Sequence, residues 1–259
     1  MTGGIHSTAI VDPSARLAPE VEIGPYSVVG ADVVIGAGTV LGPHVVIGAR
    51  TTLGARNRVF QFASIGEIAQ DRKYSGEPTT TTIGDDNTFR EYATVHAGTA
   101  QDRGDTRIGD GNLFLAYTHV AHDCVVGNLT TFSNNAQIAG HVHIDDWAVL
   151  GAFAGVHQFV RVGAHTMLAA FAVVLQDVPP YMTVQGYPAK PHGTNSEGLR
   201  RRGFAAEDIL QIRRAYKTLY RENLTLDDAR AKIAAAAAQA SVLAPLASFL
   251  AASGRGIVR

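Results

Sequence analysis

Aliphatic side chains recur at every sixth residue through the first two thirds of the chain. Ten consecutive blocks open with one, from Val11 to Ile65. The register returns at Ile83 and, after an offset of one residue, continues from Ile108 to Val174. A period of six is too short for a pair of helices and is typical of a parallel β-helix, in which each block is one short strand and one turn.

Three such blocks make one triangular coil of eighteen residues, and the coils stack at the strand spacing of about 4.8 Å. The opening aliphatic residue points inward, and a small or β-branched residue in the fifth position, such as Ala15 or Val33, fills the space beside it. Glycine often follows the opening residue, as at Gly24 and Gly48, which suits either a positive φ or a close backbone approach. We therefore predict roughly nine coils, which form a prism about 40 Å tall.

Two polar segments interrupt the repeat, at 67–82 and 97–107. Both are predicted to be loops that leave the prism. Loops held on a rigid scaffold often carry binding residues, so both are candidates for contributing to a site.

The period changes to a helical one near residue 190. We predict a β-helical domain over 1–190 and a small helical C-terminal domain over 191–259. Apolar residues at spacings of three and four support a first helix over 205–221. Two more helices are predicted over 229–240, after an N-cap near Thr225, and over 241–252, with Pro245 in the first turn.

Composition narrows the class of protein. The chain has 259 residues and a net charge of −1, which does not suggest nucleic-acid binding. The single cysteine, Cys124, excludes an internal disulfide, indicates a reducing compartment and is expected to pack in the interior. No apolar window is long enough for a transmembrane segment, and no signal peptide is recognisable, so we expect a cytoplasmic protein.

The eighteen-residue coil places His122, Gly140 and Gln158 above one another on one prism edge. Imidazole is the common general base near neutral pH, and the adjacent Asp123 could fix its tautomer. The N–H of Gly140 could stabilise an oxyanion, a combination that suits acyl transfer by direct attack with no metal ion. The same edge also gathers His119, His141 and His157, with His96 on a lower coil.

The other histidines and a basic face receive simpler interpretations. The four remaining corner histidines are predicted to be surface polar residues: His6, His44, His143 and His165. The C-terminal domain carries several arginines, which are either a solvated face or a docking surface for an acidic partner.

Seven local motifs make the chain resemble the UDP-N-acetylglucosamine O-acyltransferase family of lipid A biosynthesis. The resemblance covers essentially the whole chain, and its motifs lie at 61–67, 70–78, 119–124, 139–142, 156–159, 176–181 and 195–204. It implies a left-handed β-helix and a homotrimer with active sites between neighbouring prisms. It also implies transfer of a 3-hydroxyacyl chain from acyl carrier protein to the 3-hydroxyl of UDP-N-acetylglucosamine. No cofactor is implied, because the donor arrives on the phosphopantetheine of the carrier protein.

The resemblance also implies roles for individual residues. His122 matches the general base, Asp123 the residue that orients it, and Gly140 the oxyanion donor. Ala170 stands where the family often has glycine, at the end of an acyl groove that measures chain length. The basic helical face matches the surface that meets the carrier protein. Substrate-binding residues are matched by Gln70, Asp71, Lys73, His96, His119, His141, His157, Gln158, Asn195, Glu197 and Arg201.

Four alternatives stay open on the sequence. Zinc hydratases of the carbonic-anhydrase type use the same scaffold, although His119 and His122 do not have their ligand spacing. Some relatives acylate a 3-amino sugar nucleotide. The N-acyltransferase of the same pathway carries an extra N-terminal domain for which the early start of the repeat leaves no room. A solenoid that serves only as a scaffold would not explain the histidine cluster.

Overall fold

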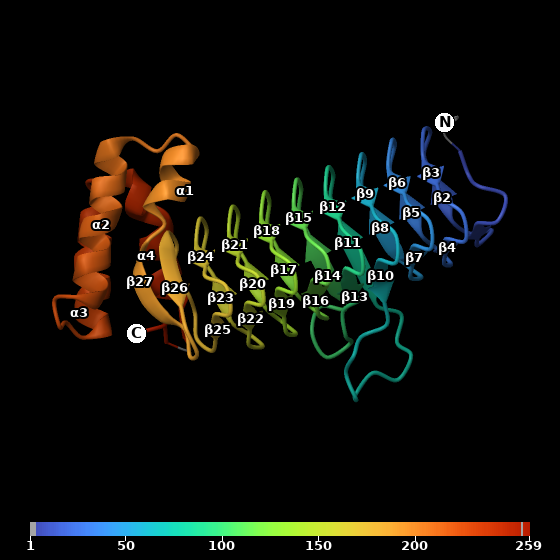
Figure 1. Cartoon of the computed structure of the whole chain (residues 1–259). Coiled ribbons are helices and arrows are strands. Elements are labelled where there is room, and N and C mark those ends of the chain that lie inside the picture. The colour runs from blue at the N-terminus through green and yellow to red at the C-terminus, as the bar shows by residue number, and fades with distance from the viewer. Residues whose placement is uncertain (1–3, 255) are drawn as a thin grey trace.

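The computed structural model describes residues 4–254 and 256–259, which form a triangular prism of three sheets capped by helices (Figure 1). Within these residues the first sheet contains β1 (Ile10–Val11), β4 (Val28–Val29), β7 (Val46–Ile47), β10 (Ser64–Glu67), β13 (Thr94–His96), β16 (His119–Val120), β19 (Gln137–Ile138), β22 (Gly155–Val156) and β25 (Val173–Val174). The second contains β2 (Arg16–Leu17), β5 (Val34–Ile35), β8 (Thr51–Leu53), β11 (Thr80–Ile83), β14 (Asp105–Ile108), β17 (Val125–Val126), β20 (His143–Ile144) and β23 (Arg161–Val162). The third contains β3 (Glu22–Ile23), β6 (Val40–Leu41), β9 (Arg58–Val59), β12 (Thr88–Phe89), β15 (Leu113–Phe114), β18 (Thr131–Phe132), β21 (Val149–Leu150), β24 (Met167–Leu168), β26 (Met182–Gln185) and β27 (Lys190–Thr194).

Consecutive strands along the chain belong to different sheets, and each pairs in parallel with the strand one coil away. Val120 pairs with Ile138, and Ile138 with Val156, so the predicted coil of eighteen residues is confirmed. The prism is the left-handed parallel β-helix that the family resemblance implies. The final hairpin is the exception, because β27 runs antiparallel to β26.

The two polar loops are shorter than predicted. Strand β10 extends to Glu67 and β11 starts at Thr80, so the first loop spans 68–79 rather than 67–82. Strand β13 ends at His96 and β14 starts at Asp105, so the second spans 97–104 rather than 97–107. Both differences have one cause: the parallel ladder continues into polar residues, where backbone pairing needs no apolar side chain.

The interior follows the predicted pattern, and of the two explanations offered for the glycines the close backbone approach applies at Gly24. The opening residues are buried from Ile23 onward, and so are fifth-position residues such as Val33. A Cβ on Gly24 would lie 2.6 Å from the Gly42 carbonyl carbon, so close backbone approach requires glycine there. The positive φ lies instead two residues further on, at fourth-position residues such as Tyr26 (φ 59°) and Asp123 (φ 59°).

A buried ladder of asparagines crosses the interior and was not predicted. The Oδ1 of Asn57 accepts the backbone N–H of Asn87, and the Oδ1 of Asn87 accepts both N–H groups of Asn112, each at 2.9 Å. The Nδ2 of Asn87 donates to the Gly109 carbonyl at 2.9 Å. Each side chain therefore satisfies backbone groups that the turns leave without a strand partner.

We expect Asn87→Ala to lower the melting temperature by several degrees or more. The change leaves the Asn112 donors and the Gly109 carbonyl in the interior without the hydrogen-bond partner that Asn87 provides. Each unpaired buried group costs about 1–3 kcal/mol. Thermal unfolding followed by circular dichroism measures the effect. Asn134→Ala, at an exposed turn, is the matched control and should melt like wild type. Equal melting temperatures for both variants would contradict the role of the ladder.

The helices gather at one end of the prism, beyond β26 and β27 and opposite β2 and β3 (Figure 1). They are α1 (Ser196–Arg201), α2 (Ala206–Tyr220), α3 (Leu226–Ala237), η1 (Ser241–Leu243) and α4 (Ala244–Ala252). Helix α2 buries the predicted face, which includes Ile212 and Leu219. The chain end returns to the prism, where the buried Asp177 accepts the Ser253 hydroxyl and its carbonyl accepts the Val258 N–H.

The predicted helices need small corrections. Helix α2 matches 205–221 within one residue, but α3 starts at Leu226, three residues before the predicted 229, because the Thr225 side chain caps Asp228 N–H directly. The last segment begins as the 3-10 turn η1, with Pro245 in the first turn of α4 as predicted. Helix α1 was not predicted, and the predicted domain boundary at 190/191 falls inside β27. No helix in the described part of the chain has the length and apolar character that crossing a membrane requires.

The prediction of surface positions holds for His6 and His44 but is wrong for His143 and His165. His143 is half-buried, and burial lowers its pKa. His165 stacks between Trp147 and Tyr181, and its Nδ1 accepts a hydrogen bond from Arg202 at 3.1 Å. Burial, followed by the charge of Arg202, lowers the pKa of His165 to about 4. The helical domain covers this corner, which the repeat alone could not indicate.

The neutral His165 predicts loss of stability in acid. In the unfolded chain a histidine has a pKa of about 6.5, whereas the pKa of His165 in the folded chain is about 4. Between these values the unfolded state binds the extra proton, so stability is complete above pH 6.5 and falls as the pH drops toward 4. We expect His165→Phe, which keeps a stacked ring, to reduce the drop in melting temperature between pH 7.5 and 4.5. An unchanged drop, equal to that of the exposed control His6→Phe, would contradict this.

Candidate active site

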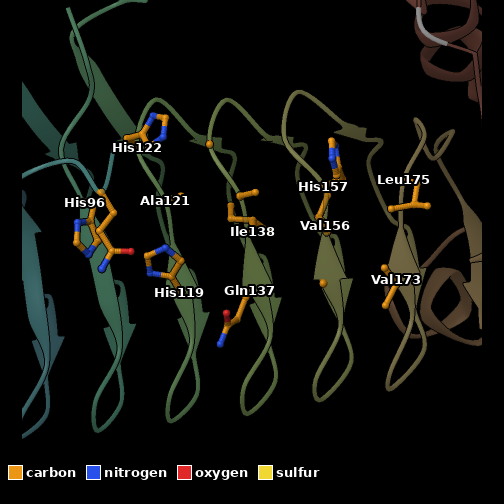
Figure 2. Close-up of a pocket in the computed structure, with 14 residues that line it drawn as sticks. His96, His119, Ala121, His122, Gln137, Ile138, Val156, His157, Val173 and Leu175 are labelled. Atoms are coloured by element: carbon orange, nitrogen blue, oxygen red, sulfur yellow. The ribbon is translucent and has the colours of Figure 1, made fainter. Parts of the chain in front are cut away.

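A groove of about 480 Å³ runs along the first sheet, across the coils from β13 to β25. Its polar end contains imidazoles, and its far end is apolar, formed by Val173 and Leu175 (Figure 2). The volume lies in the range of small-molecule sites. Besides those two, the lining residues are Gln70, His96, His119, Ala121, His122, Gln137, Ile138, Ala139, Gly140, Gly155, Val156 and His157.

His122 and Asp123 form a hydrogen-bonded pair at the edge of this groove. The His122 Nδ1–H donates to Asp123 Oδ2 at 2.8 Å, which leaves Nε2 as the nitrogen able to accept a proton. Asp123 is fully buried and also accepts both the N–H and the hydroxyl of Thr99, at 2.9 and 2.7 Å. Burial alone would raise the pKa of Asp123, but these bonds from His122 and Thr99 and the nearby His141 outweigh it and hold the pKa below its usual range. The carboxylate is therefore negative and fixes the imidazole in one orientation.

Gly140 packs against the ring of His122 from the next coil. A Cβ on Gly140 would lie 2.5 Å from His122 Cε1 and 2.7 Å from Nε2, so only glycine allows this approach. The predicted juxtaposition of these two residues is therefore what the structure shows. Within the described residues, no protein group accepts a hydrogen bond from the Gly140 N–H, which leaves this donor available to a ligand.

His96, from β13, and His119, from β16, also line the groove (Figure 2). Their ring centroids are 5.3 Å apart, the His96 Nδ1–H donates to the Ile68 carbonyl at 2.6 Å, and His119 Nδ1 bonds the Thr94 hydroxyl at 2.8 Å. Burial lowers the pKa of His119 to about 4, with His96 and His122 adding to the effect. His119 is therefore neutral at physiological pH and serves as a hydrogen-bonding group rather than a cation.

His141, His157 and Gln158 lie along the same edge. His141 Nδ1–H donates to Asp102 Oδ2 at 2.7 Å, and its ring stacks on Phe159 with centroids 4.3 Å apart. His157 lines the groove, whereas Gln158 lies exposed one coil beyond Gly140. The structure thus gathers the predicted histidines on one edge of one prism.

His122, Asp123 and His141 also place ligand atoms within 4.8 Å of one another, a spacing that a metal ion could bridge. Two ligands on a tetrahedral zinc ion, each at about 2.1 Å, lie about 3.4 Å apart. The 2.8 Å contact between His122 Nδ1 and Asp123 Oδ2 is shorter than this and is a hydrogen bond. The geometry therefore fits a base and its orienting carboxylate better than a zinc site.

Cys124 is buried, as predicted, and its thiol donates to the Ala139 carbonyl at 3.1 Å. Burial is the main cause that raises its pKa to about 12. A thiol that keeps its proton is a poor nucleophile, so Cys124 is not suited to form a covalent intermediate.

Several predicted site residues lie outside the groove of this chain. Gln70 lines it, but Asp71 and Lys73 sit further along the same loop, where the Asp71 carboxylate accepts the Lys73 N–H at 2.9 Å. Ala170 lies exposed in the turn between β24 and β25, just before the apolar end. Three more residues matched to substrate binding do not line the groove and lie at α1 beside the His165 corner: Asn195, Glu197 and Arg201.

Other groups at the site escaped prediction. The contacts of Thr99, Asp102 and Thr94 with site residues join segments outside the eighteen-residue register, and Gln137 lines the groove from β19. The polar character of the 97–107 segment was the available signal for Thr99 and Asp102, and the eighteen-residue register, which places Gln137 beside His119, was the signal for Gln137. In the basic C-terminal face, Arg202 packs over Trp147 at 5.0 Å, so this arginine is a packing residue and not free for docking.

Comparisons with known proteins agree with this geometry. The sequence profile described as "Udp N-acetylglucosamine O-acyltransferase; Domain 2" matches residues 177–258, and the one described as "Bacterial transferase hexapeptide (six repeats)" matches residues 26–61. The chain is 58% identical over 255 residues to the acyl-[acyl-carrier-protein]–UDP-N-acetylglucosamine O-acyltransferase of Thiobacillus denitrificans, with 98% of this chain and 99% of that protein covered. The protein of the same name from Janthinobacterium sp. is 55% identical, with the same coverage.

Solved structures give the same picture. The UDP-N-acetylglucosamine acyltransferase of Francisella novicida superposes with a TM-score of 0.97 at 44% identity, covering 99% of this chain and 94% of that one. The Arabidopsis protein of that name superposes with a TM-score of 0.84 at 29% identity, covering 98% and 99%.

Proposed function

Because the chain belongs to the acyl-[acyl-carrier-protein]–UDP-N-acetylglucosamine O-acyltransferase family, we propose that it carries out the first step of lipid A biosynthesis. In this reaction it moves a 3-hydroxyacyl chain from acyl carrier protein to the 3-hydroxyl of UDP-N-acetylglucosamine. The observation that carries the mechanism is the His122–Asp123 pair packed against Gly140 in a groove with an apolar end.

The proposed mechanism is a direct attack. The Nε2 of His122 takes the proton of the sugar hydroxyl while the hydroxyl oxygen forms a bond to the thioester carbonyl carbon. The Gly140 N–H donates to the carbonyl oxygen, which becomes negative in the tetrahedral intermediate. The C–S bond then breaks, and the proton on His122 passes to the departing thiolate. Asp123 stabilises the imidazolium through Nδ1 throughout.

Two observations support direct transfer over a covalent acyl-enzyme. The Cys124 thiol is buried and protonated, and no serine is among the described residues that line the groove. The proposal requires no cofactor of the enzyme itself, since the acyl group arrives as a phosphopantetheine thioester. The zinc hydratase is not favoured, and acylation of a 3-amino sugar is left to the assay.

We also propose that the protein acts as a homotrimer in the cytoplasm, with sites shared between neighbouring prisms. Asn195, Glu197 and Arg201 do not line the groove of their own chain, and a site shared with a neighbouring chain would bring them to the substrate. A ladder of exposed aromatic side chains also runs along the edge between the first and third sheets, and such apolar stripes often mark interfaces. Its stacked members are Tyr26, His44, Phe62, Tyr92 and Tyr117.

The test is transfer of labelled acyl groups from a panel of 3-hydroxyacyl carrier proteins to UDP-N-acetylglucosamine. We expect product with at least one chain length and none with carrier protein that lacks the acyl group. Parallel reactions with the 3-amino analogue separate O-acylation from N-acylation. Failure with both acceptors and every chain length would overturn the proposal, and light scattering of the same preparation tests the trimer.

The turn that holds Ala170 predicts the chain-length preference. We expect Ala170→Gly to shift the preferred acyl chain toward a longer one, because Ala170 lies in the turn just before Val173 and Leu175, where an acyl chain that extends past the groove would meet its methyl group. One methylene in an apolar pocket changes kcat/KM by about 10-fold to 200-fold. The same carrier-protein panel measures the shift, and an unchanged preference would show that Ala170 does not limit the groove.

A further inference from the structure

The loop 97–104 folds back onto the catalytic edge and binds the Asp123 carboxylate with a single residue, Thr99. The Thr99 N–H donates to Oδ1 at 2.9 Å, and the Thr99 hydroxyl donates to Oδ2 at 2.7 Å. Thr99 is 1% exposed and Asp123 is fully buried, so water cannot readily replace either bond. One residue thus donates hydrogen bonds to both oxygens of the carboxylate that also accepts a hydrogen bond from His122 Nδ1–H.

We infer that Thr99 is a positioning residue for the proposed base, because it fixes the Asp123 carboxylate in the orientation in which Oδ2 receives the His122 Nδ1–H. The inference rests on the proposed role of His122. Thr99 is not one of the described residues that line the groove, and its hydroxyl bonds Asp123, so we assign its effect to that carboxylate.

The arrangement around Asp123 shows why its carboxylate needs this restraint. The Nδ1 of His141 lies 3.9 Å from the same Oδ2 that His122 uses, so a second imidazole is within reach of a modest rotation. Asp102, from the same loop as Thr99, accepts the His141 Nδ1–H at 2.7 Å and satisfies that competing donor. The loop therefore assigns one carboxylate to each imidazole.

The backbone of Asp123 is anchored without Thr99. Its N–H donates to the Thr106 hydroxyl at 2.8 Å, and its carbonyl accepts from Arg103 at 2.9 Å. Loss of the Thr99 hydroxyl should therefore release Oδ2 from this loop and loosen the orientation of the carboxylate, while the Thr99 N–H still holds Oδ1 and the turn keeps its conformation. This separation makes Thr99 testable without unfolding the site.

Thr99→Val removes the hydroxyl and keeps the shape of the side chain. We expect kcat to fall by about 10-fold to 100-fold, the range known for groups that orient a metal-ligating histidine, while KM for both substrates changes much less than kcat. Thr99→Ser should restore most of the activity. The matched control is Thr39→Val, which removes a buried hydroxyl that donates to Gly54 in a distant coil and should leave kcat unchanged.

The decisive measurement is a double-mutant cycle. If Thr99 acts through Asp123, Thr99→Val should cost nothing further in an Asp123→Ala background, because the carboxylate it orients is absent. A full additional loss in that background, or a loss equal to that of Thr39→Val in the wild type, would overturn the inference.

A second readout needs no catalysis and so separates this inference from the proposed function. The His122 Nδ1–H should give a low-field proton resonance in the enzyme without substrate, assigned by its absence in His122→Ala. We expect this resonance to disappear or move upfield in Thr99→Val and to persist in Thr99→Ser. An unchanged resonance in Thr99→Val would overturn the positioning role even if transfer activity is confirmed. Its loss would support that role even if the transfer assay fails.

Discussion

His122→Ala is expected to lower kcat by roughly 10³-fold, within the 10²-fold to 10⁴-fold contribution of general acid–base catalysis. The variant removes the group that takes the hydroxyl proton, while Gly140 and the apolar end of the groove remain to bind and polarise the thioester. KM should therefore change much less than kcat. Initial rates of acyl transfer at saturating donor and acceptor measure the effect.

A control variant and a rescue experiment make this result specific to His122. His6→Ala removes an exposed imidazole far along the chain and should retain wild-type rates. Added imidazole should partly restore His122→Ala, because the deleted ring leaves space beside Gly140. Wild-type kcat in His122→Ala would refute the base assignment and leave the fold untouched.

The period of the sequence predicted the part of this site that lies on the prism. Residues eighteen apart must stack in a β-helix, so the contact between Gly140 and the ring of His122 follows from their numbers alone. The same register explains why Cys124, in a fifth position, is buried. It also explains why Asp123, in a fourth position, adopts a positive φ at the corner.

What the sequence could not predict depends on segments that leave the repeat. Thr99 reaches Asp123 and Asp102 reaches His141 only because the loop 97–104 folds back along the edge, and no periodicity determines that path. The burial of His165 likewise depends on where the helical domain settles, since Arg202 and its neighbours cover a corner that would otherwise face water.

The asparagine ladder was not predicted because the repeat pattern does not indicate polar side chains that point inward. Asn57 occupies a fifth position, where the repeat favours small or β-branched residues, and polarity there would ordinarily argue against an inward side chain. Asn57, Asn87 and Asn112 are nevertheless fully inside, because each finds partners on the coil above and in the adjoining turn. Those partners become visible only when the coils are stacked in three dimensions.

Gly140→Ala is expected to lower kcat by about 10²-fold to 10³-fold, comparable to the loss of an oxyanion donor, with little change in stability. The new Cβ would lie 2.5 Å from His122 Cε1 and 2.7 Å from Nε2, a separation at which one group must move. All three close contacts are with the imidazole, so the ring moves and its 2.8 Å bond to Asp123 breaks. Melting temperature and kcat, measured on the same preparation, separate the two effects.

The structure supplies both a control and a discriminating double variant. Gly193→Ala adds the same methyl group where no atom lies within 4 Å and should behave as wild type. In a His122→Ala background, Gly140→Ala no longer has a ring to displace, so its cost should shrink to what the methyl group does to the oxyanion position alone. If the cost in that background equals the cost in wild type, Gly140 acts on the oxyanion and not through His122. If it vanishes, glycine is required at this position for the close approach of the base.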